Sequence, residues 1–237
     1  MLLYVYRSYG YYFDPTYLLV LIGLVLSLWA QYMVNSRFKK YSKVRSSRNI
    51  TGAEVAERIL RSHGINDVRV EHIAGKLSDH YDPKNKVLRL SDSTYNSTSV
   101  AAIGVAAHEC GHAVQHALGY GPLRMRSALV PVVNFASNIV QWVLLAGVIF
   151  FQAFPGLLWF GIALFATTTL FSFITLPVEV NASTRAISWL ESAGVTDYQT
   201  RPMAIDALKW AAYTYVIAAL GSLATLLYYI GLARSRD

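Results

Sequence analysis

The longest uncharged stretch of the chain, SALVPVVNFASNIVQWVLLAGVIFFQAFPGLLWFGIALFATTTLFSFITLPV at residues 127–178, decides the fold class. It runs for 52 residues without an Asp, Glu, Lys or Arg. A helix needs about 20 apolar residues to cross the hydrocarbon core of a bilayer, so this stretch is long enough for two crossings. Pro155 and Gly156 supply a turn near its middle. We therefore expect helices near residues 136–154 and 157–176, joined as a tight hairpin.

Two further uncharged segments each predict one more membrane span. Residues 15–36 and 210–233 contain 22 and 24 residues without charge, which is the length of a single crossing. The whole chain is 54% apolar and only 15% charged, whereas soluble domains carry about a quarter of charged residues. The sequence thus predicts a mainly α-helical protein with four transmembrane helices in a lipid bilayer.

The N-terminal stretch MLLYVYRSYGYYFD, residues 1–14, lacks the basic start and the small-residue cleavage site of a signal peptide. We therefore expect the first span to be an uncleaved anchor. The tyrosines of this stretch fit either an aromatic belt at the membrane interface or an exposed aromatic tail.

Basic residues gather beside the first span and predict its orientation. Residues 37–48 carry six Lys or Arg and no acid, which is typical of a cytoplasmic flank. Because the hairpin crosses twice, residues 179–209 return to the same side. Arg234 and Arg236 would then lie outside, but these two residues are fewer than the six basic residues at 37–48. The basic cluster is compatible with a solvated linker or with anionic lipid binding.

The formal net charge of +7 does not indicate nucleic acid, because the basic residues are not spread along a face with interleaved aromatics. The single cysteine, Cys110, excludes an intrachain disulfide and a cysteine-rich zinc site. Any metal site must therefore use histidines and carboxylates.

The region between the first span and the hairpin predicts a small α+β unit. Thr51 is a candidate N-cap for an amphipathic helix that ends at Gly64. The stretches DVRVEHI and KVLRLS predict two short strands, and DPKN between them predicts a turn. Residues 97–118 predict one mostly apolar helix, ended by Gly119, Gly121 and Pro122.

The pentapeptide HECGH, residues 108–112, places two histidines four positions apart on that last helix. Such residues are about 6 Å apart along the axis and about 40° apart around it, so His108 and His112 can bind one ion. Glu109 lies beside that face, where it can take a proton from a water molecule at the metal. With Zn²⁺, whose bound water has a pKa of about 7, this pattern indicates amide hydrolysis. The simpler alternative is a packed helix with two buried, hydrogen-bonded histidines.

His116 and Cys110 are not expected to bind the same ion. His116 lies about 12 Å along the helix axis from His108, too far for one ion on a continuous helix. Metzincins turn the chain with a glycine three residues after the second histidine, where Gln115 stands here. Cys110 projects to the far side of the helix and reads as a small packing residue.

Glu179 is the candidate third ligand. It is the first charge after the long uncharged stretch, and the two crossings bring it back to the side of His108. A carboxylate at the mouth of a span is costly unless it is paired, and a metal would pair it. The alternative is that Pro177 begins a new helix, which places Glu179 at a position that favours an acid. Glu191 and Asp206 are further candidates.

Several blocks of the chain together resemble one protein family. TGAEVAERIL, LSDHYDPKNKVLRLSDSTY, SVAAIGVAAHECGHAVQHALGY, PLRMRSALVPVVN and LPVEVNASTRA are similar to the YugP-type neutral zinc metallopeptidases of bacterial membranes, across about residues 15–232. The resemblance implies a membrane-embedded zinc endopeptidase related in plan to the HtpX and CAAX-protease group. It also implies a gluzincin-like site, in which His108, His112 and Glu179 are the zinc ligands and Glu109 is the general base.

The chain departs from the family patterns just after Glu179. Ser183 stands where the CAAX proteases have an aspartate that orients a ligating histidine, and Asn181 stands where we expect an acid. A weaker orienting partner lowers metal affinity. In the DHYDP block, His80 or Tyr81 could stabilise the oxyanion of the transition state. A plain β-turn there, with Asp82 before proline, is slightly favoured.

Two functions fit these observations. The first is a zinc-dependent endopeptidase of the bacterial inner (plasma) membrane, with its active site on the cytoplasmic side and with peptide segments of membrane or misfolded proteins as substrates. The second is a non-catalytic metal-binding or scaffold membrane protein. Glu109 favours the first, because a structural site has no use for a base beside its ligand and is closed by a fourth protein ligand.

The expected architecture is a four-helix membrane protein with a small α+β zincin-like cytoplasmic subdomain that carries the HExxH helix. The segments are residues 1–14 (N-terminal segment), 15–36 (first transmembrane helix), 37–126 (cytoplasmic metallopeptidase subdomain), 127–178 (transmembrane hairpin), 179–209 (cytoplasmic helical segment with the third ligand), 210–233 (fourth transmembrane helix) and 234–237 (tail).

Overall fold

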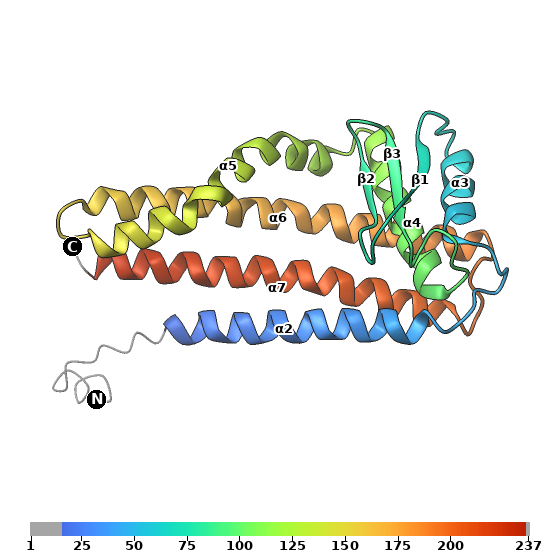
Figure 1. Ribbon diagram of the computed structural model, residues 1–237, viewed down its shortest axis with the longest axis horizontal. Coiled ribbons are helices and arrows are strands. Elements are labelled where there is room, and N and C mark those ends of the chain that lie inside the picture. Colours follow the sequence, from blue (N-terminus) through green and yellow to red (C-terminus); the bar gives the residue numbers. More distant parts are fainter. Residues whose placement is uncertain (1–15, 236–237) are drawn as a thin grey trace.

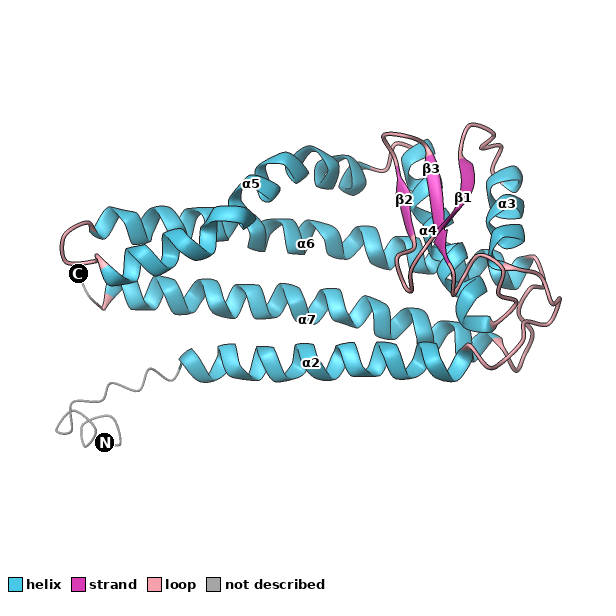
Figure 2. Ribbon diagram, in the orientation of Figure 1, coloured by secondary structure: helices cyan, strands magenta, loops and turns pink. Residues whose placement is uncertain are grey.

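The computed structural model describes residues 16–235, which form a mainly helical protein with one small sheet (Figures 1 and 2). The predictions for residues 1–14 and for Arg236 lie outside these residues. The elements are α2 (Thr16–Tyr41), α3 (Gly52–Ser62), β1 (Arg69–Ile73), β2 (His80–Asp82), β3 (Val87–Ser91), α4 (Val100–Ala117), α5 (Gly121–Ile149), α6 (Pro155–Ser192) and α7 (Arg201–Arg234).

Four helices within residues 16–235 are long and apolar enough to cross a membrane, as predicted. They are α2, α5, α6 and α7, and most of their length runs side by side (Figure 1). The sheet, α3, α4 and the α6–α7 connection gather at one end of these helices, and the α5–α6 connection lies at the other. The two regions predicted to share one side of the membrane therefore lie together.

The hairpin of α5 and α6 turns where the sequence predicts, but both helices are longer than predicted. α5 begins at Gly121 rather than near residue 136, and α6 continues through Pro177 to Ser192. Pro177 therefore does not begin a new helix, and that alternative for Glu179 is wrong. A proline inside a helix removes one hydrogen bond and bends the chain, which membrane helices tolerate when neighbouring helices support them.

α5 also has an internal proline, Pro131. The first part of the helix stands away from α6 and the second part packs along it (Figure 1). The close packing of the second part depends on Gly147, because a Cβ there would lie 2.6 Å from the Leu158 Cα atom. Small residues at such contacts let membrane helices approach closely.

The predicted helix after residue 50 is α3, and Thr51 is its N-cap. The Thr51 hydroxyl accepts a hydrogen bond from the Glu54 N–H at 3.2 Å, and the Glu54 carboxylate accepts one from the Thr51 N–H at 2.7 Å. This capping box satisfies two N–H groups at the start of the helix. Gly64, with φ of 68°, follows its end as predicted.

The sheet has the order β1-β3-β2, with β1 parallel and β2 antiparallel to β3. The two predicted strands are β1 and β3. Contrary to the favoured β-turn, residues His80–Asp82 form the edge strand β2, and the turn follows that strand. The Asp82 carboxylate accepts hydrogen bonds from the N–H groups of Lys84 and Asn85 at 3.0 and 3.1 Å. Three residues are too few for an alternating pattern to reveal a strand.

The histidine-bearing helix is α4, close to its predicted limits. Ser99 caps it by accepting a hydrogen bond from the Ala102 N–H at 3.2 Å, and Gly119, with φ of 62°, follows it. α4 lies among α3, the sheet and α6, and most of its residues are buried. A helix held on several sides is a rigid support for a site.

Candidate metal centre

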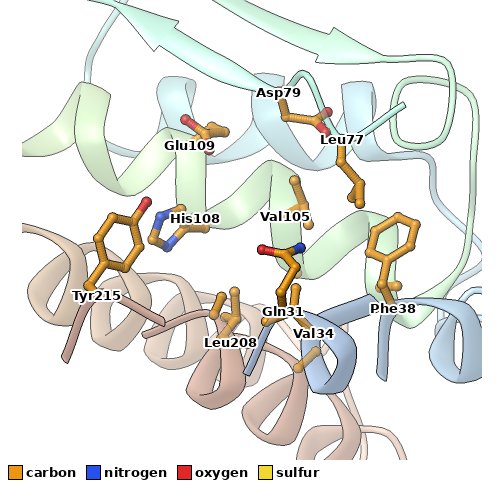
Figure 3. A pocket seen from close by; sticks show the side chains of 14 residues that line it. Gln31, Val34, Phe38, Leu77, Asp79, Val105, His108, Glu109, Leu208 and Tyr215 are labelled. Carbon is orange, nitrogen blue, oxygen red and sulfur yellow. The ribbon is translucent and has the colours of Figure 1, made fainter. Parts of the chain in front are cut away.

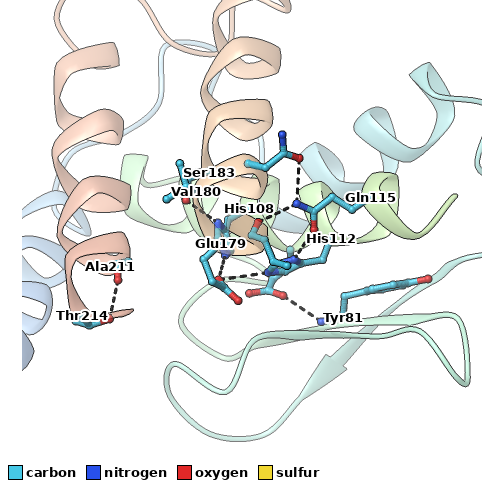
Figure 4. A network of polar contacts seen from close by, with 12 residues as sticks. Tyr81, His108, His112, Gln115, Glu179, Val180, Ser183, Ala211 and Thr214 are labelled. Atoms are coloured by element: carbon cyan, nitrogen blue, oxygen red, sulfur yellow. Dashed lines mark hydrogen bonds and ion pairs between the residues drawn. The ribbon is translucent and has the colours of Figure 1, made fainter. Parts of the chain in front are cut away.

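His108 and His112 lie one turn apart on α4 and project together, with their ring centroids 4.8 Å apart. Glu179 of α6 faces both rings (Figure 4). Its Oε2 atom lies 3.2 Å from His108 Nε2 and 3.6 Å from His112 Nε2. One ligand atom from each residue lies within 4.8 Å of the others, so the three residues could hold a metal ion.

The donor set and its spacing fit zinc. Zinc binds imidazole nitrogen and carboxylate oxygen, and ligands at about 2.0–2.1 Å in a tetrahedron are about 3.3 Å from one another. The distances from Glu179 to the two histidines bracket that value. Three protein ligands leave a tetrahedral ion one open position, as in catalytic zinc sites.

Gly111, inside the HECGH motif, lets α6 approach α4 closely enough to bring Glu179 to the histidines. A Cβ at this position would lie 2.7 Å from the Ala182 carbonyl oxygen and 2.9 Å from the Ala182 Cα. Any other residue would push the two helices apart. The glycine of the motif therefore sets the position of a carboxylate that is 68 residues away in the sequence.

Both histidines are oriented through their Nδ1 atoms. His108 Nδ1 lies 3.1 Å from the Ser183 hydroxyl oxygen, and His112 Nδ1 lies 3.1 Å from Gln115 Oε1. Because an amide oxygen only accepts, His112 Nδ1 carries the proton and Nε2 keeps its lone pair towards Glu179. Such partners fix the tautomer and the ring orientation of a metal-binding histidine.

Gln115 also ties α4 to α6. Its amide nitrogen donates to the Val178 carbonyl oxygen at 2.8 Å and to Asn181 Oδ1 at 3.0 Å. Of the two departures from the family patterns, Ser183 thus contacts the candidate ligand His108, and Asn181 contacts Gln115, the partner of His112. The sequence did not reveal Gln115 as a partner, because its contacts lie on a helix 63 and 66 residues away.

Glu179 is buried, with 2% of its surface exposed, so its charge needs partners. Besides the histidines, Arg126 at the start of α5 places its Nη1 atom 3.5 Å from Glu179 Oε1. Sequence reasoning missed Arg126, although a signal was present. Arg126 is the last charge before the uncharged stretch and Glu179 is the first after it, and a hairpin brings such ends together.

Glu109 follows His108 on α4 and accepts a hydrogen bond from the Tyr81 backbone N–H of β2 at 3.0 Å. This contact directs the carboxylate from outside α4. Burial raises the pKa of the Glu109 carboxyl above its ordinary value, although the two histidines of the motif oppose that shift. A carboxylate with a raised pKa is a stronger base towards a neighbouring water.

Comparison with known families matches residues 16–234 to the family described as "Putative neutral zinc metallopeptidase". The chain belongs to this family. It is also 46% identical over 212 residues to the "Putative membrane protease YugP" of Bacillus subtilis (strain 168). The aligned region covers 90% of this chain and 93% of that protein. No solved structure matches the chain. The family resemblance seen in the sequence is thus confirmed.

In this member of the neutral zinc metallopeptidase family, a cleft of about 570 Å³ opens onto the candidate ligands. Its walls come from β2 and the turn after it, the first part of α5, and one face of α7. The side chains that can reach its interior include the candidate ligands and His80, Lys84, Arg126 and Tyr215. The centre is therefore open on one side, as a site that must admit a substrate has to be.

The other residues singled out in the sequence lie away from the candidate ligands. His116 Nδ1 lies 2.8 Å from the Tyr81 hydroxyl oxygen, which fastens β2 to α4. Cys110 is buried, and its thiol faces the Ala56 carbonyl oxygen at 3.7 Å. Burial raises the pKa of that thiol well above its ordinary value, which suits a packing residue.

The two reserve carboxylates have other partners. Glu191 forms an ion pair with Arg201 at 3.0 Å, and Asp206 forms one with Arg37 at 2.9 Å. Neither belongs to the metal-binding group found within residues 16–235. Of the three acids considered, Glu179 alone lies beside the histidines.

Proposed function

We propose that the chain is a zinc-dependent endopeptidase embedded in the membrane, with His108, His112 and Glu179 as the zinc ligands and Glu109 as the general base. The observation that carries this proposal is the meeting of three suitable ligand atoms within 4.8 Å, in a chain of the zinc metallopeptidase family. The proposed site would be zincin-like and of the gluzincin type, with a glutamate from a later helix as the third ligand; the position of Glu179 on α6 supports this.

The residues of the site have different roles in the proposed peptide hydrolysis. When bound, zinc supplies Lewis acidity towards the scissile carbonyl and towards the attacking water. Glu109 accepts a proton from that water and passes it to the leaving amine. The Tyr81 N–H holds the Glu109 carboxylate in place for both transfers. The Ser183 and Gln115 contacts keep the imidazole rings aimed at the centre.

The negative charge that develops on the scissile oxygen needs a donor. His80 is the predicted stabiliser, and it lines the cleft. Its Nδ1 atom, 2.8 Å from the Ser78 carbonyl oxygen, must carry the proton there, which leaves Nε2 of a neutral ring without one. Arg126 lines the same cleft, and its guanidinium has N–H donors besides the Nη1 group that faces Glu179. It is a stronger candidate for this role than His80.

The alternative, a non-catalytic metal-binding or scaffold protein, requires a closed site. Structural zinc sites complete their tetrahedron with a fourth protein ligand. Within residues 16–235, the group contains three candidate ligands, and it adjoins a cleft of about 570 Å³. These features favour hydrolysis over storage or structural binding.

The decisive experiment measures zinc content and hydrolysis of an unfolded protein by the purified full chain and by Glu109→Gln. We expect the variant to keep stoichiometric zinc and to lose activity by at least the roughly 10²–10⁴-fold that general base catalysis contributes. Glu57→Gln, an exposed glutamate of α3, is the matched control and should change neither. If Glu109→Gln cleaves as fast as the wild type, the non-catalytic reading is correct.

We also propose that the site faces the cytoplasm of a bacterial cell, at the inner membrane. The basic residues after α2 lie at the same end of the helices as the metal centre, in keeping with the excess of positive charge in cytoplasmic loops. Substrates would be peptide segments of membrane or misfolded proteins that reach this face.

Orientation can be tested with thiol labelling, because Cys110 is buried and contributes little background. Lys43→Cys and Gln152→Cys place exposed thiols at opposite ends of the helices. In intact cells stripped of their outer envelope, a membrane-impermeant maleimide should label the second variant and not the first. The reverse pattern would refute the proposed orientation.

A further inference from the structure

A second cavity, of about 360 Å³, adjoins the metal centre between α2, α4, α7 and the loop that joins β1 to β2 (Figure 3). It shares four lining residues with the cleft that holds the candidate ligands, namely Asp79, His108, Glu109 and Tyr215. A peptide whose scissile bond lies at the metal therefore has side chains within reach of both spaces.

The second cavity is walled mainly by apolar side chains. Val34 and Phe38 come from α2, Val105 comes from α4, and Leu208 comes from α7. Phe38 and Leu208 are buried, so they belong to the packed protein and do not swing freely. These residues form a fixed apolar wall opposite the catalytic side.

The charged groups at this cavity do not suit an acidic guest. Asp79 lines it, but its two carboxylate oxygens accept hydrogen bonds from the Ser91 N–H and the Ser91 hydroxyl at 2.8 and 2.9 Å. The other carboxylate is Glu109, the proposed base. An acidic side chain would meet two negative charges.

Leu77 covers the cavity in a strained conformation. Its φ is 57°, in the left-handed region that a bulky residue rarely occupies. It is also 40% exposed, and its side chain points across the cavity towards Phe38 (Figure 3). A strained backbone that exposes an apolar side chain gains nothing for folding. Strain of this kind is typical of ligand-binding positions.

We propose that this cavity is a specificity pocket for a large apolar side chain of the substrate, on the residue next to the scissile bond, with Val34 and Leu77 as specificity-determining residues. The inference rests on the proposed peptidase function. Side chains of neighbouring residues in an extended peptide are about 3.3 Å apart along the chain, so a side chain next to the reacting carbonyl reaches a pocket that contains His108 and Glu109.

The test uses the full chain in detergent micelles and β-casein as an unfolded substrate, with the cleavage sites mapped by mass spectrometry. The wild type should cut mainly beside Leu, Ile, Met or Phe. Val34→Phe reduces the pocket, and it should lower kcat/KM for a synthetic peptide with one of these residues at the mapped site by about 10–200-fold. The matching peptide with Ala there should be cut at the wild-type rate.

Val25→Phe is the matched control. It makes the same change on α2 at a residue that is 63% exposed and does not line the pocket. The control should keep the wild-type preference. If Val34→Phe cleaves at the same sites and with the same ratio of rates as Val25→Phe, the pocket proposal is overturned while the peptidase function stands. If the wild type cleaves nothing, the proposed function itself fails.

Leu77→Asn provides a second test that does not depend on filling the pocket. Asparagine adopts the left-handed region more readily than leucine, so the melting temperature should stay the same or rise. Cleavage beside large apolar residues should nevertheless fall several-fold relative to cleavage beside alanine. An unchanged ratio, in a variant of unchanged or higher stability, would contradict the role of Leu77.

Discussion

The two halves of α6 lie in opposite chemical surroundings, although one continuous helix carries both. The first half packs against α5 with buried apolar residues such as Leu158 and Ile162. The second half packs against α4 and presents Glu179 and Ser183 to the histidines. The same helix therefore contributes to helix packing at one end and to the candidate metal centre at the other.

Both halves use the same device to approach their neighbour. A glycine on the partner helix meets the α6 backbone in each case, Gly147 at Leu158 and Gly111 at Ala182. Close approach in the first half only improves packing, whereas in the second half it also fixes the distance between candidate ligands. We therefore expect that packing defects of equal size at the two contacts have unequal effects on the affinity for zinc.

The largest difference should come from Glu179→Ala compared with Leu158→Ala. We expect the first to abolish zinc binding, with a loss beyond the roughly 10–100-fold that changes outside the ligand set cause. The second should destabilise the protein by about 2–5 kcal/mol through a cavity and leave one zinc per chain. Metal analysis and thermal unfolding measure the two effects. Equal zinc loss in both variants would show that the halves are not separable.

A smaller difference is expected between Gly111→Ala and Gly147→Ala. Each added Cβ meets the backbone of α6 at less than 3 Å, and overpacking of this kind costs about 1–3 kcal/mol. The Gly111 variant should also bind zinc about tenfold more weakly or worse, because Glu179 moves away from the histidines. Competition with a chelator measures that affinity. Weakened zinc binding in the Gly147 variant, at equal stability, would contradict the separation.

The smallest difference in zinc affinity is expected between variants that remove one of two neighbouring hydroxyl groups on α6. Ser183→Ala removes the partner of His108 Nδ1 and should weaken zinc binding by about tenfold, the lower end for such partners. Thr184→Ala is the matched control, because its hydroxyl is exposed and bonds only to the Val180 carbonyl of the same helix. The two variants should differ in zinc affinity and not in melting temperature. Equal affinities would leave Ser183 without a role at the metal.

Much of the architecture could be predicted from the sequence, because the features involved act locally or by length. Three uncharged stretches, one of them long enough for two crossings, predicted the four membrane helices, and the capping residue Thr51 predicted the start of α3. The spacing of His108 and His112 predicted that they share a face. The resemblance to a family, together with the count of two crossings, predicted that Glu179 lies near them.

The errors concern features that depend on tertiary contacts. Pro177 is a stop signal in an isolated helix, but α6 continues through it, as membrane helices do where neighbouring helices compensate for the lost hydrogen bond. Strand β2 has only three residues and exists because β3 pairs with it. The hydrogen bonds from Gln115 to α6 and from the Tyr81 N–H to Glu109 join segments far apart in the chain, so no local sequence pattern predicts them.

The interval of 71 residues between His108 and Glu179 has a consequence for biogenesis. The ribosome makes both histidines before it makes the hairpin, and it makes the glutamate only after the hairpin. Glu179 lies beside the histidines only when the hairpin of α5 and α6 has formed. The candidate metal centre is thus completed late in synthesis, and a chain truncated before α6 lacks its third candidate ligand.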